Sequence, residues 1–187
     1  MLSEHSDDEK IIDRVRKGDT ELYRIIVARY QQKLYAIGMR FCKNHDDACD
    51  FTQEVFLKAY NSLGTFKGIS RFNFWLVKIA YNHGINSVKA EKPRDSLNEE
   101  MLPFRGITPE QSMIRGEIII ALERSLSELP EKYRVCIDLY FFCGLSNFEI
   151  AEITGFPLNT VKSNIFRAKN QMRNALTGSI AEEYHEM

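Results

Sequence analysis

Long apolar runs are missing from this chain of 187 residues. None approaches the ~20 consecutive apolar residues that a membrane-spanning helix needs, so insertion into a bilayer is not expected. The N-terminal stretch Met1–Glu9 is acidic and lacks the apolar core of a secretory signal peptide. Hydrophobic residues make up 44% of the chain and charged residues 27%, which is typical of a soluble globular protein. We therefore expect a cytoplasmic protein.

Cysteine is scarce and never occurs as a CxxC pair. The four cysteines fit a reducing cytosol better than a disulfide framework. The spacing of Cys42, His45 and Cys49 offers three metal ligands as an alternative, but buried thiols in a helical core are the favoured interpretation. No metal is expected.

Signatures of catalysis are also missing. The chain has no HxE motif combined with CxxC, no phosphate-binding loop and no nucleophile motif. An enzyme acting on nucleic acid is therefore the weakest interpretation, and we expect neither catalytic residues nor a cofactor. The histidines are scattered and are interpreted as structural or solvent-exposed; they are His5, His45, His83 and His185.

No segment has the alternating pattern of a strand, whereas apolar residues recur at helical spacing along most of the chain. Asp19 or Thr20 is expected to cap the second helix, and the two glycines of 64–70 indicate a loop. The sequence thus predicts an all-α fold. The expected helices cover roughly 7–17, 20–41, 46–63, 71–89, 109–128, 131–143, 146–154 and 157–176.

Near the C-terminus, local signals predict two short helices joined by a tight turn. Ser146 and Glu149 form a capping box, Gly155 permits a sharp reversal, and Pro157 suits the first turn of a helix. The apolar residues expected to face inward in the second helix are Leu158, Val161, Ile165, Ala168 and Met172. Its outward residues are expected to be Lys162, Ser163, Asn164, Arg167 and Lys169, and no acid occurs from 156 to 176.

Two helices with these properties form a helix-turn-helix, whose second helix can enter a major groove. The alternative is an ordinary helical hairpin with a solvated basic face. Charge segregation favours nucleic acid. Although the net charge is −1, residues 67–92 carry five basic residues against one acid, and 93–130 carry seven acids against four arginines. Two basic segments, 67–92 and 156–176, suggest two DNA contacts on one chain.

The expected helix at 71–89 is unusually aromatic. Phe72, Phe74, Trp75 and Tyr81 cover more of its circumference than one buried stripe needs, with basic residues between them. Exposed aromatic rings beside basic residues supply stacking surfaces for unpaired bases. The alternative is an aromatic-rich core helix, in which Trp75 is largely buried.

Prolines and mixed charge without sustained periodicity mark residues 93–111 as a flexible linker. Near its end, Thr108 and Gln111 form a further capping box with Pro109 at the first helical position. The predicted organisation is one small helical domain over 1–92, this linker, and a second helical domain over 112–178.

The order of these features resembles the extracytoplasmic-function group of bacterial RNA polymerase sigma factors. In the first half the resemblance lies in Asp47-Ala48-x-Asp50-x-x-Gln53-Glu54-x-Phe56 and in Phe66-Lys-Gly68-x-x-x-Phe72-x-x-Trp75-Leu76-x-x-Ile79-Ala80-x-Asn82. In the second half it lies in Leu129-Pro130, Gly144-Leu145-Ser146-x-x-Glu149-Ile150-Ala151 and Thr160-Val161-Lys162-Ser163. The first half is then sigma-2-like and the second sigma-4-like.

The resemblance assigns roles to three groups of residues. Those implied to dock on core polymerase are Asp47, Asp50, Gln53 and Glu54. Those implied to open the −10 element and capture an extruded base are Phe66, Ile69, Ser70, Arg71, Phe72, Trp75, Lys78 and Asn82. Those implied to meet the duplex −35 element are Thr160, Lys162, Ser163, Asn164, Phe166 and Arg167.

The implied function is to direct core RNA polymerase to promoters and initiate transcription. The implied partners are promoter DNA, the coiled coil of the polymerase largest subunit, the flap of the second-largest subunit, and an inhibitory anti-sigma factor. A stand-alone helix-turn-helix regulator, binding a palindrome as a dimer, is the alternative. The sequence departs from the family pattern at Phe74, Asn86, Lys89 and Asn164, and Asn164 stands where the family often has arginine.

Overall fold

The computed structural model describes residues 2–42, 44–90, 121–122 and 124–176. Within these ranges the regular secondary structure is helical and includes no strand. The chain divides into two compact units, one within Met1–Glu100 and the other within Met101–Met187. The prediction of an all-α chain with two helical parts is confirmed.

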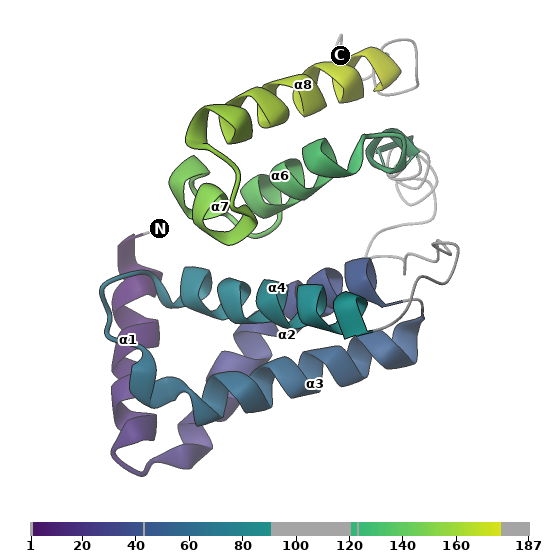
Figure 1. The fold of residues 1–187 in the computed structure, drawn as a ribbon. Helices are drawn as coiled ribbons and strands as arrows, with labels where there is room; N and C mark the ends of the chain where they lie inside the picture. The colour runs from purple at the N-terminus through teal and green to yellow at the C-terminus, as the bar shows by residue number, and fades with distance from the viewer. Residues whose placement is uncertain (1, 43, 91–120, 123, 177–187) are drawn as a thin grey trace, which may run out of the picture. The chain divides into compact units, whose positions relative to one another are not determined.

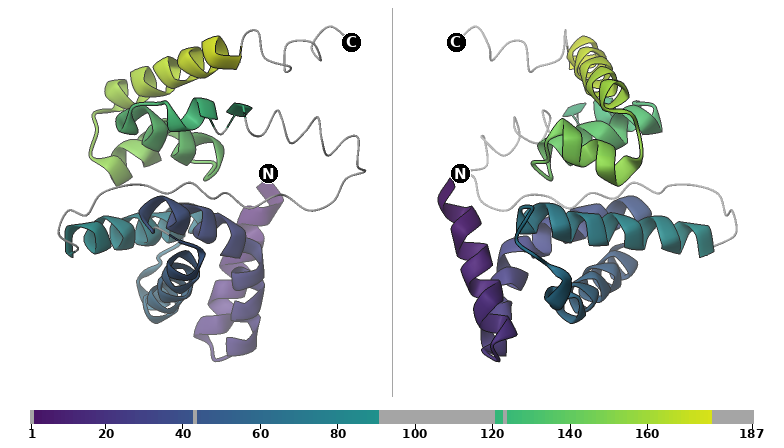
Figure 2. Two further views of the ribbon diagram at one scale, coloured as in Figure 1. Left: turned by 90° about the vertical axis from the view of Figure 1, so that its right-hand side faces the viewer. Right: turned by 60° about the vertical axis from the view of Figure 1, so that its left-hand side comes forward.

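In its described residues the first unit contains four α-helices and two short 3-10 turns (Figure 1). The α-helices pack against one another, and α1 also lies along the connection between α3 and α4 (Figures 1 and 2). The bounds are α1 Leu2–Arg16, η1 Thr20–Leu22, α2 Tyr23–Phe41, α3 His45–Asn61, η2 Leu63–Thr65 and α4 Phe72–Ala90.

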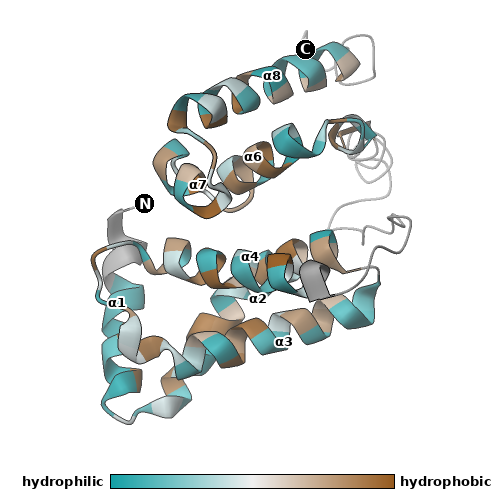
Figure 3. Cartoon of the chain, in the orientation of Figure 1, coloured by the Kyte–Doolittle hydropathy of each residue, from teal (hydrophilic) through white to brown (hydrophobic). Residues whose placement is uncertain are grey.

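Apolar side chains from each helix meet in the core of this unit, while hydrophilic residues cover the outer sides (Figure 3). Helices α2 and α3 cross closely at Gly38. A Cβ at that position would lie 2.9 Å from the Phe51 ring and 3.1 Å from the Ala48 carbonyl oxygen. The glycine therefore lets two backbones approach where a larger residue would force them apart.

One predicted helix start is wrong and another is refined. The Asp19 carboxylate makes no cap hydrogen bond and instead pairs with Arg14 at 2.5 Å, while Thr20–Leu22 forms the 3-10 turn η1. Neither Asp19 nor Thr20 therefore caps α2. At α3, the Asn44 side chain accepts a hydrogen bond from the Asp47 backbone N–H at 2.8 Å, which satisfies one free donor of the first turn.

The described part of the second unit contains α6 Glu131–Phe141, α7 Asn147–Thr154 and α8 Leu158–Leu176, preceded by helical residues 121–122 and 124–127. Helix α8 packs on α6 and α7. Leu158 was expected to face inward but is 38% exposed, because it lies in the first turn of α8, ahead of the buried stripe that begins at Val161.

The capping box of α7 is confirmed. The Ser146 side chain accepts from the Glu149 backbone N–H, and the Glu149 carboxylate accepts in return from the Ser146 backbone N–H. Gly155 ends the helix at φ 73°, a left-handed conformation that favours glycine. These local contacts fix the turn between α7 and α8.

Several sequence predictions fall outside the described residues. They are the linker at 93–111, the Thr108 capping box, and the two domain boundaries that border the linker. None of the helices that the structure describes is long and apolar enough to pass through a lipid bilayer.

Candidate nucleic-acid interface

A polar and acidic row runs along the exposed side of α3. The residues of the row all lie on the solvent side of the helix and are Asp47, Asp50, Gln53 and Glu54. The opposite side of α3 is buried and includes Ala48, Phe51 and Val55. Because the core packs on one side only, the row is available to a partner without disturbance of the fold.

Glu54 links this row to α4. The Nε2 atom of His83 lies 3.1 Å from a Glu54 carboxylate oxygen, and the Lys58 ammonium contacts Nδ1 of the same ring. Burial and the Lys58 charge lower the pKa of His83, while the Glu54 carboxylate acts in the opposite direction. His83 therefore favours the neutral form, in which one ring nitrogen donates and the other accepts.

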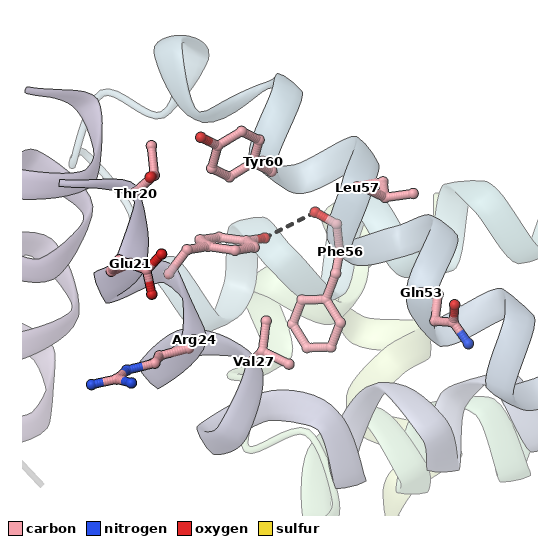
Figure 4. Close-up of a pocket in the computed structure, with 9 residues that line it drawn as sticks. Thr20, Glu21, Arg24, Val27, Gln53, Phe56, Leu57 and Tyr60 are labelled. Carbon is pink, nitrogen blue, oxygen red and sulfur yellow. Dashed lines mark hydrogen bonds between the residues drawn. The ribbon is translucent and has the colours of Figure 1, made fainter. Parts of the chain in front are cut away.

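A shallow groove adjoins the row between the start of α2 and α3 (Figure 4). Gln53 belongs to both features, and Leu57 and Tyr60 project from the next turns of α3 with 64% and 37% exposure. The Tyr23 hydroxyl donates to the Phe56 carbonyl at 2.9 Å, and both residues line the groove. This apolar extension of the row was not predicted from the sequence, because helical periodicity does not show where a neighbouring helix leaves a groove.

The rings at the start of α4 are packed rather than free. Phe66 is 3% exposed and Phe72 is fully buried, and each has its ring centroid about 5.5 Å from that of Trp75. Phe74 and Tyr81 are also buried, at 5% exposure each. Because Phe66 and Phe72 are buried, neither ring presents a face to a base, and their implied part in base capture is corrected from direct contact to support of the neighbouring segment.

The segment between these two phenylalanines is open to solvent. Ile69 is 89% exposed, and Ser70 and Arg71 are half-buried. Gly68 has φ 70°, which turns the chain outward just before Ile69. We call residues 67–71 the protruding loop. It presents the apolar side chain of Ile69 and the polar or charged side chains of Lys67, Ser70 and Arg71.

Two further predicted contact residues lie on α4 beyond the loop. Asn82 is exposed, and Lys78 is half-buried with its ammonium 5.9 Å from the Phe74 ring centroid. Asn82 can therefore offer amide groups to a base edge, and the Lys78 charge is held near the helix surface.

Helix α8 carries the second predicted set of contact residues. Lys162, Phe166 and Arg167 are exposed, with Phe166 at 65%. Thr160 and Ser163 are half-buried. These side chains lie outside the buried stripe of α8, which agrees with an outward basic face.

Arg167 is held in place rather than loose. Its Nη1 donates to the Tyr133 hydroxyl at 3.2 Å, and this hydrogen bond lowers the pKa of the phenol. Lys169 is engaged too, because its ammonium lies 4.8 Å from the Tyr140 ring centroid and 5.0 Å from that of Phe141. Arg167 is therefore oriented by a hydrogen bond, whereas Lys169 lies over two aromatic rings.

Asn164 does not belong to the outward face. It is 3% exposed, and its Nδ2 donates to the Lys132 carbonyl at 3.3 Å and approaches the Cys136 sulfur at 3.6 Å. Both partners lie on α6, so Asn164 ties α8 to α6. Its predicted role in contacting DNA is corrected to a structural one.

Asn164→Ala is expected to destabilise the folded chain by about 1–2 kcal/mol, because the buried Asn164 side chain is lost and the Lys132 carbonyl loses a donor in a partly buried site. Asn164→Asp is expected to cost more, since it places a carboxylate oxygen against that carbonyl. Urea denaturation measures both effects. The control Asn159→Ala alters an exposed residue of the same helix and should change stability by less than about 0.5 kcal/mol. Equal effects for the Asn159 and Asn164 variants would contradict this assignment.

The metal site that the sequence offered as an alternative is only partly assembled in the structure. The His45 Nε2 atom lies 3.5 Å from the Cys49 sulfur, and its Nδ1 lies 2.9 Å from the Tyr35 hydroxyl. Among the described residues, no group of three or more His, Cys, Asp or Glu side chains is arranged to hold a metal ion.

Comparison with known families matches both units. Residues 26–94 match the family model for sigma-70 region 2, and residues 119–172 match the model for sigma-70, region 4. The RNA polymerase sigma-H factor of Pseudomonas aeruginosa is 35% identical over 193 residues, covering 97% of this chain and all of that protein. The ECF RNA polymerase sigma-E factor of Escherichia coli is 35% identical over 184 residues, covering 92% of this chain and 96% of that protein.

Solved structures show the same fold. CnrH, in complex with the cytosolic domain of CnrY, aligns with a TM-score of 0.64 and 21% identity, covering 92% of this chain and 98% of that one. The sigma factor RpoE of Bartonella quintana, in complex with the anti-sigma factor NepR, aligns with a TM-score of 0.63 and 20% identity. That alignment covers 84% of this chain and 98% of the other.

Proposed function

Because this chain belongs to the extracytoplasmic-function group of the sigma-70 family, we propose that it is the promoter-specificity subunit of an RNA polymerase and initiates transcription at two-element promoters. It binds core polymerase through the first unit, captures unpaired bases of the −10 element with the same unit, and reads the duplex −35 element with the second. No step requires catalysis by this chain.

The acidic row on α3 is the proposed polymerase contact. Asp50 lies in its middle and Glu54 at its end, and both carboxylates are exposed. The adjoining groove supplies the apolar surface that a stable interface needs at its centre, with Leu57 as the most exposed large apolar side chain on α3. We propose that the coiled coil of the polymerase largest subunit lies along the row and buries Leu57. The flap of the second-largest subunit is the proposed partner of the second unit.

The protruding loop and the α4 surface are the proposed −10 contacts. Ile69 provides an apolar surface against a flipped base, Ser70 offers a hydroxyl, and Asn82 can hydrogen-bond a base edge. Arg71 and Lys78 supply positive charge for phosphates. Phe66, Phe72 and Trp75 support the loop from beneath.

The outward face of α8 is the proposed −35 contact. Arg167 and Lys162 are the candidates for guanine recognition, which is the commonest specific contact in a major groove. Phe166 can meet a thymine methyl group, and Thr160 and Ser163 can reach phosphates near the start of the helix.

The observation that best supports this function is that residues 26–94 match sigma-70 region 2 and residues 119–172 match sigma-70, region 4. The protruding loop agrees with the proposal, because Ile69 is 89% exposed and offers an apolar surface. A melted base loses its stacking partners and can regain contacts on such a surface.

The test compares the free chain with the reconstituted holoenzyme on one promoter duplex. The proposal expects weak binding by the free chain at moderate salt, and specific transcription once core polymerase is added. Tight binding of a palindromic duplex by the chain alone, without association with core polymerase, would instead establish the stand-alone regulator.

An inhibitory partner is part of the proposal. The similar Bartonella quintana protein was solved with an anti-sigma factor. We propose that an anti-sigma factor binds this chain and competes with core polymerase for the acidic row and its groove. Asp50→Arg should then weaken both associations, whereas α8 variants should leave the competition for the first unit unchanged.

A further inference from the structure

Arg16, the last residue of α1, joins that helix to the segment that leads into the protruding loop. Its Nε donates to the Leu63 carbonyl at 2.9 Å, and its Nη2 donates to the carbonyls of Leu63 and Phe66. The guanidinium carbon also lies 5.9 Å from the Phe66 ring centroid. These contacts span 47 and 50 residues of sequence.

The carbonyls that Arg16 contacts lie at the turn that precedes the protruding loop. Leu63–Thr65 forms the 3-10 turn η2, and Phe66 leaves it in extended conformation with ψ 108°. The Leu63 carbonyl also accepts the hydrogen bond of this turn from the Phe66 backbone N–H at 3.1 Å, and the Phe66 carbonyl lies beyond the turn. A guanidinium has donors in a fixed planar fork and can serve two carbonyls at once, whereas a lysine ammonium is a point charge on a flexible stem.

The protruding loop is consequently fixed at both ends. Phe66 is held by Arg16 on one side and by the Phe72 and Trp75 rings on the other, with ring centroids 5.4 and 5.5 Å away. Phe72, at the far end, is fully buried and also packs against Tyr30 of α2. Only the residues between these anchors protrude, so the position of Phe66 determines where Ile69 points.

We propose that Arg16 is a positioning residue for base capture. It shapes the protruding loop from behind and does not touch DNA itself. The inference rests on the proposed function, in which this loop holds an unpaired base of the −10 element. Loss of the guanidinium releases the Phe66 carbonyl and lets the loop move, so that the contacts of Ile69 and Ser70 with the captured base are lost.

The chain offers a matched control on the same helix. Arg14 is also basic and near the end of α1, but its side chain is 66% exposed and pairs with Asp19. Arg14→Ala therefore removes one positive charge from α1 without touching the loop. Arg16→Lys keeps the charge and removes the fork, so it serves as a second variant whose fold is less at risk than that of Arg16→Ala.

The experiment measures binding of reconstituted holoenzyme to forked promoter DNA whose non-template −10 strand is unpaired. Each −10 nucleotide is replaced in turn by an abasic site. Wild type and Arg14→Ala should lose roughly tenfold in affinity at the captured position, as expected for one stacked base. Holoenzymes that carry Arg16→Ala or Arg16→Lys should bind the intact fork roughly tenfold more weakly than wild type does. The abasic site should then lower their affinity only a little further. Binding to core polymerase should stay unchanged.

A different pattern would overturn the inference. If the Arg16 variants bind intact and abasic forks more weakly by the same factor, the base contact survives and Arg16 is only a structural tie. Unchanged binding to the intact fork would also refute the positioning role. If wild type itself is insensitive to every abasic site, base capture by this chain is refuted, and the inference falls with the proposed function.

Discussion

Asp50→Arg is expected to abolish the association of this chain with core RNA polymerase. Asp50 lies on the exposed side of α3, in the middle of the acidic row and one turn from the apolar groove. A reversed charge at the centre of an interface places like charges together and leaves them desolvated, at a cost of several kcal/mol. The expected loss of affinity is at least roughly a hundredfold.

The measurement is a titration of labelled chain with core polymerase, combined with thermal unfolding of each variant. Asp7→Arg is the matched control, because Asp7 is an exposed acid on α1 and not on α3. Unfolding should be the same for Asp50→Arg and wild type, since Asp50 does not pack in the core. An unchanged affinity of Asp50→Arg for core polymerase would remove the docking assignment.

Arg167→Ala is expected to lower transcription from a promoter that depends on its −35 element by roughly 5- to 150-fold, the equivalent of about 1–3 kcal/mol for one specific base contact. Arg167 is exposed on α8 and oriented by the Tyr133 hydroxyl at 3.2 Å. Because its side chain is preorganised, little conformational entropy is lost when it meets a base.

Single-round transcription with holoenzyme on matched templates measures this effect. Arg173→Ala serves as control, since Arg173 is exposed on the same helix but lies six residues beyond Arg167 toward its C-terminal end. The Arg167 variant should also discriminate less between −35 sequences that differ at one base pair. An equal loss on all templates, or no loss, would show that Arg167 does not read a base.

Local sequence signals predicted the helix-turn-helix well. The Ser146–Glu149 capping box and Gly155 act within a few residues of chain, so nothing distant has to be known. The outward direction of Lys162 and Arg167 also followed from the helical period. Asn164 did not follow from it, because its partners Lys132 and Cys136 are 32 and 28 residues away on α6.

The aromatic helix shows the limit of periodicity. The composition of 71–89 indicated more rings than one buried stripe needs, but α4 is covered from more than one side. Phe72 packs against Tyr30 of α2 as well as against Phe66, which lies before the helix. A single sequence cannot show how many neighbours a helix has, so the alternative of a packed aromatic core was correct for Phe72, Phe74 and Tyr81.

Two other side chains, those of Asp19 and Arg16, bind partners that the sequence patterns did not predict. Asp19 had the residue type of a helix cap but pairs with Arg14 instead. Arg16 had the appearance of an ordinary surface cation on a short helix, and its two carbonyl partners belong to a turn far along the chain. The first pair is local but does not follow from residue type alone, and the second joins residues 47 and 50 positions apart, so no local pattern predicts it.

The central claim is that the first unit binds unpaired bases of the −10 element and the second unit binds double-stranded −35 DNA. It is tested most directly by site-specific photocrosslinking in an open promoter complex, with the crosslinker placed at Ile69 and at Lys162 in separate samples. The account predicts that Ile69 crosslinks only to −10 nucleotides of the melted non-template strand and that Lys162 crosslinks only to paired −35 DNA. Crosslinks from Ile69 to duplex, or from neither position to DNA, would contradict it.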